Sequence, residues 1–479
     1  MTRKSPGRSR CRALCVLLLF CLLFSALPAF AADEDGLSLS LPKTVKGYTA
    51  CAITVNAPAA GEVLLTLYDS LDNPWLYRRE TLAAGENTLA WDGLGMNGEK
   101  LMSGPFRFEA LLRAEGGREW TASAAFSVQG FAPALGLAIP SSEKLYLDQR
   151  ERWFVECWVP SACIVAMEVR DAGDAVVYSR SVTLQDADRD TLSWNGVGSN
   201  HKKVAPGEYT VRLWAKQNPS FARSFSLTVE ETAPETPAVS VTGPVVPERG
   251  MTDAEIWDIM MKPSVVINKK GSSLRIDLRE SPSARSASAG VVCSATQALE
   301  VLALEDGWAL VRAWNYNNAE EITGYIPVSD LTVTSPASRY GVLVDKRAQT
   351  LTVYENGSPI GTVPVSTGLP TEGHPEQETP PGAFMTDIHF SPSFAQDGLR
   401  YDYPLRYQGG NIIHSTGFRR IPHTAYSVKD YSGNLSLLGQ KASHGCVRVS
   451  PFATADCPIN SYWLWTHLPL HTRVIILPD

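Results

Sequence analysis

Cysteine is scarce in this 479-residue sequence, which contains only nine. Cys11, Cys15 and Cys21 lie in an N-terminal segment that we expect to be removed. The others are too few for a disulfide framework in so long a chain; they are Cys51, Cys157, Cys163, Cys293, Cys446 and Cys457. No Cys-x-x-Cys pair is present, so we expect no metal and no other cofactor. Cys157 and Cys163 lie on either side of an expected turn, and the sequence leaves open whether they form a disulfide.

Long apolar runs are also missing, with one exception near the N-terminus. Residues 13–27 form an apolar run that follows a cluster of Lys and Arg and precedes the cleavage-like segment Ala-Phe-Ala at 29–31. This pattern is typical of a secretory signal peptide over residues 1–31. An uncleaved membrane anchor is the alternative, but the run is shorter than the ~20 residues that a spanning helix needs. We therefore expect a secreted protein of the cell wall or periplasm, with no membrane contact beyond this segment.

The sequence has no excess of basic charge. Its formal net charge is −7, and removal of the basic N-terminal segment makes the charge more negative. Surfaces that bind nucleic acid are rich in Lys and Arg, so nucleic acid is excluded as an expected partner. The length alone predicts two to four domains.

Short runs of alternating apolar and polar residues fill the first half of the chain, broken by Gly, Pro, Asn and Asp. The segment 91–97, Trp-Asp-Gly-Leu-Gly-Met-Asn, recurs as Trp-Asn-Gly-Val-Gly-Ser-Asn at 194–200. A period this long indicates two tandem domains, over residues 36–130 and 137–230, each expected to be a β-sandwich. Both resemble the immunoglobulin-like domain of the flagellar-hook-cap (FlgD) type. Trp91 and Trp194 are expected core anchors.

A Pro-rich linker and a short helix are expected over residues 231–262. Thr252 is the expected cap of a helix from Asp253 to Met261. The β-rich segment 264–335 follows, with Gly-Trp-Ala-Leu-Val at 307–311 and Gly-Tyr-Ile-Pro at 324–327. This order resembles a bacterial SH3-like domain, in which Trp308 would belong to the core. The sandwiches and this domain are read either as wall- or partner-binding modules for other cell-wall proteins or as spacers.

The segment 443–448, Ser-His-Gly-Cys-Val-Arg, carries the expected chemistry. A cysteine is a useful nucleophile only as thiolate, which requires a neighbouring imidazole or positive charge. His414, at the end of an apolar strand-like run, could supply the imidazole. Small residues before Cys446 leave backbone N–H groups free to face a developing oxyanion. Arg448 offers the planar fork of donors that suits a carboxylate. Acyl transfer on an acidic peptide is therefore the expected reaction class.

The same residues resemble the active-site signature of the L,D-transpeptidase (YkuD-type) catalytic domain, which would cover residues 338–479. The resemblance implies that Cys446 is the nucleophile, that His414 is the base, and that the Ser415 carbonyl orients the imidazole. The Gly445 and Cys446 N–H groups would line the oxyanion hole. Substrate-binding residues are expected at Ser443, His444 and Arg448. The expected fold class is mainly β and multidomain: two Ig-like sandwiches, an SH3-like small barrel and this domain.

The sequence departs from the family in the distance between base and nucleophile, which is about twice the usual one. The extra residues, 416–442, are expected to form a long surface loop or lid. They also make His423 a rival base. A papain-like hydrolase would need a histidine after Cys446, and only His467 and His471 qualify. A metal site at the same cluster fits no recognised zinc spacing.

The resemblance implies peptidoglycan stem peptides as substrates. The thiolate would attack the carbonyl on the L-centre of a diamino acid, expel D-alanine and leave a thioester. A side-chain amine of a second stem peptide would then give a cross-link. Water as acceptor would give an L,D-carboxypeptidase, and another amine a protein-to-wall ligase. A wall-binding scaffold with little catalysis is the alternative from a different class.

Overall fold

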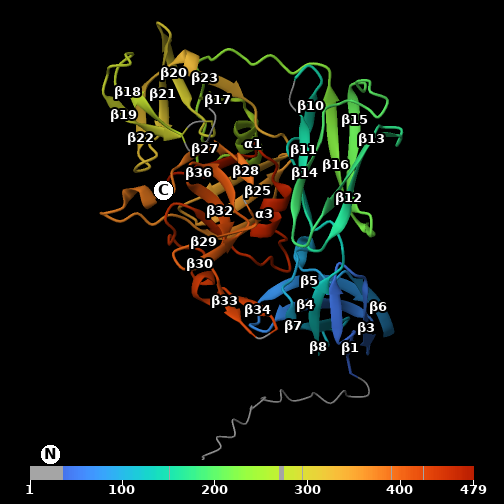
Figure 1. The fold of residues 1–479 in the computed structure, drawn as a ribbon. Coiled ribbons are helices and arrows are strands. Elements are labelled where there is room, and N and C mark those ends of the chain that lie inside the picture. The colour runs from blue at the N-terminus through green and yellow to red at the C-terminus, as the bar shows by residue number, and fades with distance from the viewer. Residues whose placement is uncertain (1–35, 150–151, 269–273, 294, 390, 424) are drawn as a thin grey trace, which may run out of the picture.

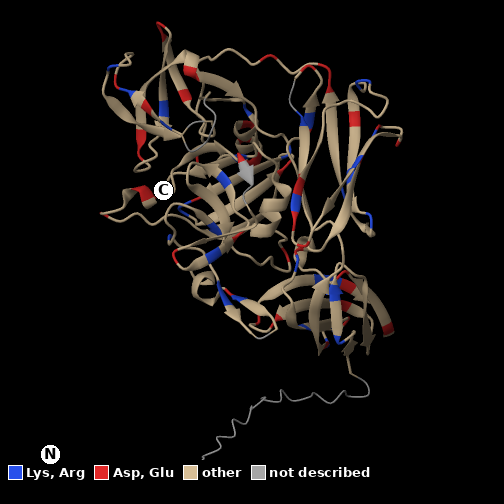
Figure 2. Cartoon of the chain, viewed as in Figure 1, with Lys and Arg blue, Asp and Glu red and all other residues tan. Residues whose placement is uncertain are grey.

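The structure is a computed structural model that describes residues 36–479 except 150–151, 269–273, 294, 390 and 424. The expected signal segment, 1–31, lies outside the described residues. The chain is mainly β and folds as a succession of separate sheets, as expected from the sequence (Figure 1). Among the described residues, no helix is long and apolar enough to cross a membrane. Acidic and basic residues are interspersed in the view of Figure 2, with neither sign gathered over one unit.

The first β-sandwich packs a three-stranded sheet, β1-β3-β6, on a five-stranded sheet, β2-β8-β7-β4-β5. Every second residue of its central strands is buried, as a sheet with one face in a core requires. Its elements are β1 (Ser38–Ser40), β2 (Thr44–Gly47), β3 (Cys51–Ala57), β4 (Gly61–Asp69), β5 (Pro74–Leu82), β6 (Gly85–Trp91), a 3₁₀ turn (Met96–Gly98), β7 (Gly104–Ala114) and β8 (Glu119–Phe131).

The second sandwich repeats this architecture, with sheets β14-β11-β9 and β10-β16-β15-β12-β13. In both sandwiches one strand of the larger sheet pairs in parallel, β2 with β8 and β10 with β16. The elements are β9 (Leu137–Pro140), β10 (Lys144–Tyr146), β11 (Trp153–Trp158), β12 (Cys163–Arg170), β13 (Val176–Leu184), β14 (Arg189–Trp194), β15 (Gly207–Ala215) and β16 (Asn218–Glu230).

The sequence repeat corresponds to one repeated turn. The indole N–H of Trp91 donates to the Leu94 carbonyl at 2.8 Å, and that of Trp194 donates to the Val197 carbonyl at the same distance. Both tryptophans are buried, which confirms them as core residues. The glycine two residues after each tryptophan has φ of +76°, a conformation that favours glycine. Cys157 and Cys163 are both free, so the disulfide that the sequence left open is not formed.

The third unit carries the sheet β19-β18-β22-β21-β20 and the pair β17-β23. Trp308 is half-buried, and the alternate residues of its strand, Ala309, Val311 and Ala313, form the core instead. The expectation that Trp308 is a core residue is therefore wrong. The elements are β17 (Ser264–Ile267), β18 (Arg275–Arg279), β19 (Ser288–Cys293), β20 (Glu300–Glu305), β21 (Trp308–Trp314), β22 (Glu321–Pro327), a 3₁₀ turn (Val328–Asp330) and β23 (Leu331–Thr334).

The expected helix before this unit is confirmed as α1 (Asp253–Met261). Thr252 accepts a hydrogen bond from the Glu255 N–H, and the Glu255 carboxylate accepts one from the Thr252 N–H in return. The C-terminal end of α1 is held by Arg473, which donates to the Met260 carbonyl at 3.0 Å and to the Lys262 carbonyl at 2.9 Å.

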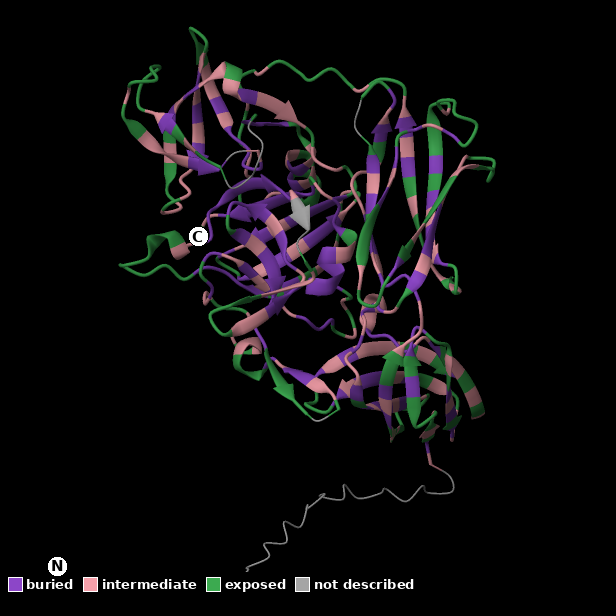
Figure 3. Cartoon of the chain, in the orientation of Figure 1, coloured by how far each residue is buried: buried purple, intermediate pink, exposed green. Residues whose placement is uncertain are grey.

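The C-terminal unit is built on a nine-stranded sheet, β27-β36-β24-β25-β26-β35-β32-β31-β28. Its strands β36 and β32 are almost wholly buried, and purple predominates in this unit in Figure 3. The elements are β24 (Tyr340–Asp345), β25 (Thr350–Glu355), β26 (Ser358–Ser366), a 3₁₀ turn (Pro375–Gln377), β27 (Gly382–Met385), β28 (Ile388–His389), β29 (Ser393–Gln396), β30 (Leu399–Asp402), β31 (Leu405–Gln408), β32 (Asn411–Ser415), β33 (Arg419–Pro422), β34 (Ser427–Asp430), α2 (Ser432–Leu435), β35 (Val447–Val449), α3 (Ser461–His467) and β36 (Arg473–Leu477).

The insertion 416–442 docks on the first sandwich instead of forming a free lid. It folds as the hairpin β33–β34 and the short helix α2, and the hairpin lies beside the blue sandwich in Figure 1. Phe418 and Tyr431, both at most 1% exposed, belong to the same apolar cluster as Trp75 of the sandwich. The Asn73 side-chain amide also donates to the Lys429 carbonyl at 3.2 Å. The insertion therefore joins the two units through a shared core.

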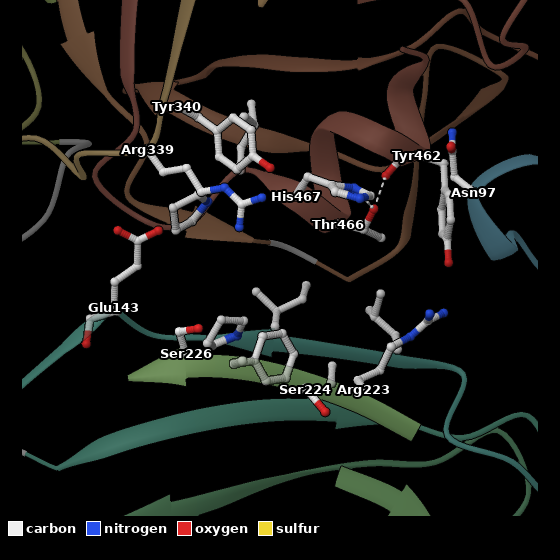
Figure 4. A pocket seen from close by; sticks show the side chains of 18 of the residues that line it. Asn97, Glu143, Arg223, Ser224, Ser226, Arg339, Tyr340, Tyr462, Thr466 and His467 are labelled. Carbon is white, nitrogen blue, oxygen red and sulfur yellow. Dashed lines mark hydrogen bonds between the residues drawn. The ribbon is translucent and has the colours of Figure 1, made fainter. Parts of the chain in front are cut away.

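The second sandwich faces the C-terminal unit across a cavity of about 650 Å³. Figure 4 shows Arg223, Ser224 and Ser226 of β16 on one wall. Tyr340 and His467 lie on the other wall. The His467 ring stacks on Trp463 of α3, with ring centroids 4.4 Å apart. His467 thus belongs to this interface.

The shared core makes a prediction about stability. Replacing Phe418 with Ala should lower the free energy of unfolding by about 3–5 kcal/mol, because it leaves a cavity inside a cluster that spans two units. Urea unfolding followed by tryptophan fluorescence would measure this loss. Ile421→Ala, at an exposed position of the same hairpin, is the control and should stay within about 0.5 kcal/mol of the parent. Equal midpoints for the two variants would contradict a docked insertion.

Candidate active site

The strand pair β32–β35 brings the two central predicted residues together. These strands are parallel, with Ile413 opposite Val447 and His414 opposite Arg448. Cys446 immediately precedes β35, so it stands at the strand end beside the segment that carries His414. Ile413, Val447 and Val449 are buried in the core of the C-terminal unit, which holds the pair in register.

His414 is buried and its ring is held by neighbours. Its Nδ1 lies 2.7 Å from the Ser415 carbonyl oxygen. Because a carbonyl can only accept, Nδ1 carries the proton, and Nε2 has the free lone pair. The rings of Tyr401 and Phe394 stand edge-on to the imidazole, with centroids 4.8 and 5.4 Å away. Burial, and to a smaller extent the nearby Arg448 charge, lower the pKa of His414 to about 3, against the opposite effect of the hydrogen bond to the Ser415 carbonyl.

The turn before Cys446 is fixed by short side chains. Ser443 is buried, and its Oγ donates to the Cys446 carbonyl at 2.5 Å and accepts from the Gly445 N–H at 3.3 Å. Gly445 has φ of +108°, and a Cβ there would lie 2.7 Å from the Asn411 side-chain oxygen. Thr379 donates to the Gly445 carbonyl at 2.9 Å. Glycine is therefore required on both steric and conformational grounds.

Cys446 rests as a thiol. The residue is only partly exposed, and burial raises the pKa of the Cys446 thiol above its ordinary value. The Ile412 backbone and the Arg448 charge act in the opposite direction but do not reverse the shift. With the pKa of His414 lowered and that of Cys446 raised, both groups are neutral near pH 7. The arrangement suits a proton transfer that accompanies attack by sulfur.

The Arg448 side chain is partly engaged by contacts within the protein. Its Nη1 donates to the Ala442 carbonyl at 3.1 Å, and its guanidinium lies 5.8 Å from the Tyr401 ring centre. Its Nε is buried and has no hydrogen-bond partner among the described residues. The residue as a whole is only half-buried.

The other predicted histidines lie outside the strand pair β32–β35. His423 is exposed in the turn of the β33–β34 hairpin, where it stacks on Tyr426. His467 faces the cavity at the second sandwich. His444 is exposed and lines a different cavity, with residues of the third unit on its far wall. The geometry therefore favours His414 over His423 as the partner of Cys446.

Two residues near the thiol were missed by the sequence reasoning. Asn411 is buried beside Gly445 and donates to the Gln408 side chain at 3.2 Å. Tyr407 is fully buried, and its hydroxyl has no hydrogen-bond partner among the described residues. Burial, and next the Cys446 charge, raise the pKa of Tyr407 well above its ordinary value. The segment 411–415 was a signal for Asn411, whereas Tyr407 precedes it in a Leu-Arg-Tyr-Gln strand that matches no motif.

The C-terminal unit matches one known protein family. Residues 339–476 match the family model of the YkuD L,D-transpeptidase catalytic domain. A putative L,D-transpeptidase, YciB, of Bacillus subtilis (strain 168) is 28% identical over 138 residues, which are 28% of this chain and 63% of that relative. The chain thus spans less than two thirds of the curated relative that it matches. These findings support a YkuD-type L,D-transpeptidase catalytic domain at 339–476.

Among solved structures, an L,D-transpeptidase from Xylanimonas cellulosilytica is 22% identical, with 29% of this chain and 60% of that chain covered and a TM-score of 0.21. An L,D-transpeptidase from Mycobacterium smegmatis is 18% identical, with 39% of this chain and 89% of that chain covered and a TM-score of 0.23.

The lowered pKa of His414 predicts a specific loss of stability in acid. Between its ordinary value of 6.5 and about 3, the unfolded chain binds a proton that the folded chain does not. Stability is therefore complete above pH 6.5 and falls as the pH drops toward 3. Between pH 7 and pH 4.5 the loss should be about 2–3 kcal/mol, at about 1.4 kcal/mol per pH unit.

Urea midpoints at both pH values would measure this loss. His414→Gln, which does not titrate, is the control and should lose less stability over the same interval. If parent and variant lose equal stability, His414 is not a buried neutral imidazole.

Proposed function

We propose that this chain is an exported peptidoglycan L,D-transpeptidase that works through a thioester on Cys446. The observation that carries the proposal is the imidazole of His414, held by the Ser415 carbonyl at 2.7 Å and set on the strand that pairs with the segment of Cys446. The family match of the surrounding unit supports the reaction class. Export rests on the sequence pattern of residues 1–31.

In the first step, Cys446 attacks the carbonyl on the L-centre of a diamino acid in the donor stem peptide. The thiol proton passes to Nε2 of His414, the nitrogen that the Ser415 contact leaves unprotonated. His414 then gives this proton to the nitrogen of the departing D-alanine as the peptide bond breaks. The product is a thioester between Cys446 and the shortened donor.

In the second step, a side-chain amine of an acceptor stem peptide attacks the thioester. His414 takes the proton of this amine and returns it to the Cys446 sulfur as the thioester bond breaks. The new amide joins the two diamino acids. Water as acceptor would release a tripeptide, and an amine of a protein would attach that protein to the wall, so the acceptor decides between these outcomes.

The oxyanion of each step would be held by backbone N–H groups of Gly445 and Cys446. The Gly445 N–H already contacts Ser443 Oγ, at the long distance of 3.3 Å. Binding of the oxyanion would therefore exchange this weak contact for a charged acceptor. Arg448, which is half-buried, would favour an acidic peptide through its positive charge.

The test uses the chain from residue 32 onward, because the insertion shares its core with the first sandwich. The protein is incubated with a disaccharide-tetrapeptide that contains meso-diaminopimelate, and the products are identified by mass spectrometry. Loss of D-alanine together with a cross-linked dimer is the expected result. Cys446→Ala should abolish both products.

Two histidine variants test the assignment of the base. His414→Gln should slow the reaction by about 100- to 10,000-fold, the usual contribution of a general base. His423→Ala, in the distant hairpin turn, should leave the rate unchanged. A shortened monomer without dimer would mean a carboxypeptidase, and no reaction with any acceptor would favour a wall-binding scaffold.

A further inference from the structure

A cavity of about 400 Å³ lies between the third unit and the C-terminal unit. Arg275, Tyr316 and Asn317 of the third unit form one wall. Glu376 and His444 belong to the opposite wall, and Asn411 also lines the space. We propose that this cavity is a donor subsite that binds the free end of the diamino-acid side chain, with its carboxylate at Arg275 and its ammonium at Glu376.

The cavity adjoins the segment that carries the predicted nucleophile. His444 stands two residues before Cys446, which limits the separation of their Cα atoms to about 7 Å. Asn411 lies against Gly445, since a Cβ on that glycine would be 2.7 Å from its side-chain oxygen. A peptide whose carbonyl is attacked by Cys446 can therefore reach the cavity with a neighbouring side chain.

The third unit is anchored firmly enough to form a wall of a binding site. Residues 296–298 extend the edge of the catalytic sheet: the Ala298 N–H donates to the Ala383 carbonyl at 2.8 Å, and the Met385 N–H donates to the Thr296 carbonyl at 3.0 Å. Arg473, which is 1% exposed, donates to Ser264 Oγ at 2.8 Å. These contacts fix the third unit relative to β27 and β36.

Buried amides also join the two walls. The Gln297 amide donates to the Trp314 carbonyl at 2.9 Å, and Gln408 donates to Gln297 at 3.3 Å. Asn411 completes the chain by donating to Gln408 at 3.2 Å. A satisfied buried network of this kind holds its members in one arrangement. Asn411 is therefore positioned from the third unit as well as from β32.

The charged groups of the cavity indicate the chemistry of its ligand. Arg275 is exposed, its guanidinium lies 4.5 Å from the Tyr316 ring centre, and it has no carboxylate partner among the described residues. A guanidinium over an aromatic ring keeps its planar fork of donors, which suits a carboxylate. Glu376 is exposed on the other wall, where its carboxylate contacts His374 Nδ1 at 3.0 Å. One cation facing one anion matches a ligand that carries both charges.

This inference rests on the proposed function, because that function places a diamino acid at Cys446. The far end of a meso-diaminopimelate side chain carries an ammonium and a carboxylate on one carbon. The donor, and not the acceptor, is the occupant. An acceptor amine must lose its proton and reach the thioester, whereas an ammonium paired with Glu376 would keep its proton and stay away from the sulfur.

The test measures binding to the chain from residue 32 onward with Cys446→Ala, so that no turnover occurs. Isothermal titration compares two tetrapeptides that differ at the third position, one with meso-diaminopimelate and one with L-lysine, which lacks the side-chain carboxylate. Adding Arg275→Ala should weaken binding of the diaminopimelate peptide by about 10- to 100-fold, the effect of a lost charged hydrogen bond. Binding of the lysine peptide should not change.

Arg285→Ala is the matched control, because Arg285 is an exposed arginine of the same unit that does not line the cavity. Glu376→Gln should weaken binding of both peptides. Equal effects of Arg275→Ala on the two peptides, or no effect on either, would overturn the subsite. If the parent protein binds neither peptide, the proposed function itself fails, and the inference fails with it.

Discussion

The parallel pairing of β32 with β35 is the constraint on which the rest of the site depends. In the sequence, His414 and Cys446 are separated by an insertion that packs against the first sandwich. The pairing of β32 with β35, which sets Ile413 opposite Val447, brings their two segments together. Both of these residues are at most 1% exposed. A slip of one residue would turn the buried face of β35 outward, at a large cost in apolar burial. The hydrophobic core thus selects the register that places the residue after Cys446 opposite the residue before His414.

A second layer of contacts ties the first sandwich to the same strand. Tyr403 donates to Glu99 of the sandwich at 2.6 Å, and the neighbouring Asp402 binds Lys429 of the insertion at 2.6 Å. The Asp402 N–H donates to Ser415 Oγ at 2.8 Å, one residue from His414. Burial raises the pKa of Glu99 to about 7, so this carboxyl is costly to charge inside the interface. These hydrogen bonds and this ion pair connect the first sandwich to Ser415, the residue whose carbonyl contacts the His414 ring.

Local sequence signals predicted local structure well and long-range packing poorly. The capped helix after Thr252, the repeated tryptophan turns and the mainly β character all follow from short-range patterns, and the structure agrees with them. The candidate residues near Cys446 could be proposed from the sequence because the thiol and the small residues of the turn before it are adjacent in the chain. Tyr407 and Asn411 were not, because their nearness to the thiol comes from pairing between distant strands.

The insertion 416–442 shows why local composition does not predict long-range packing. Residues 416–442 have the composition of a surface loop, and that composition says nothing about which surface they meet. The loop prediction failed because Phe418 and Tyr431 find apolar partners on another unit, where their burial outweighs the polarity of the residues between them. The same reasoning applies to the third unit, which extends the edge of the catalytic sheet through Ala298. The first and third units, which the sequence left open as binding modules or spacers, therefore pack against the C-terminal unit and contribute to its core and to the edge of its sheet.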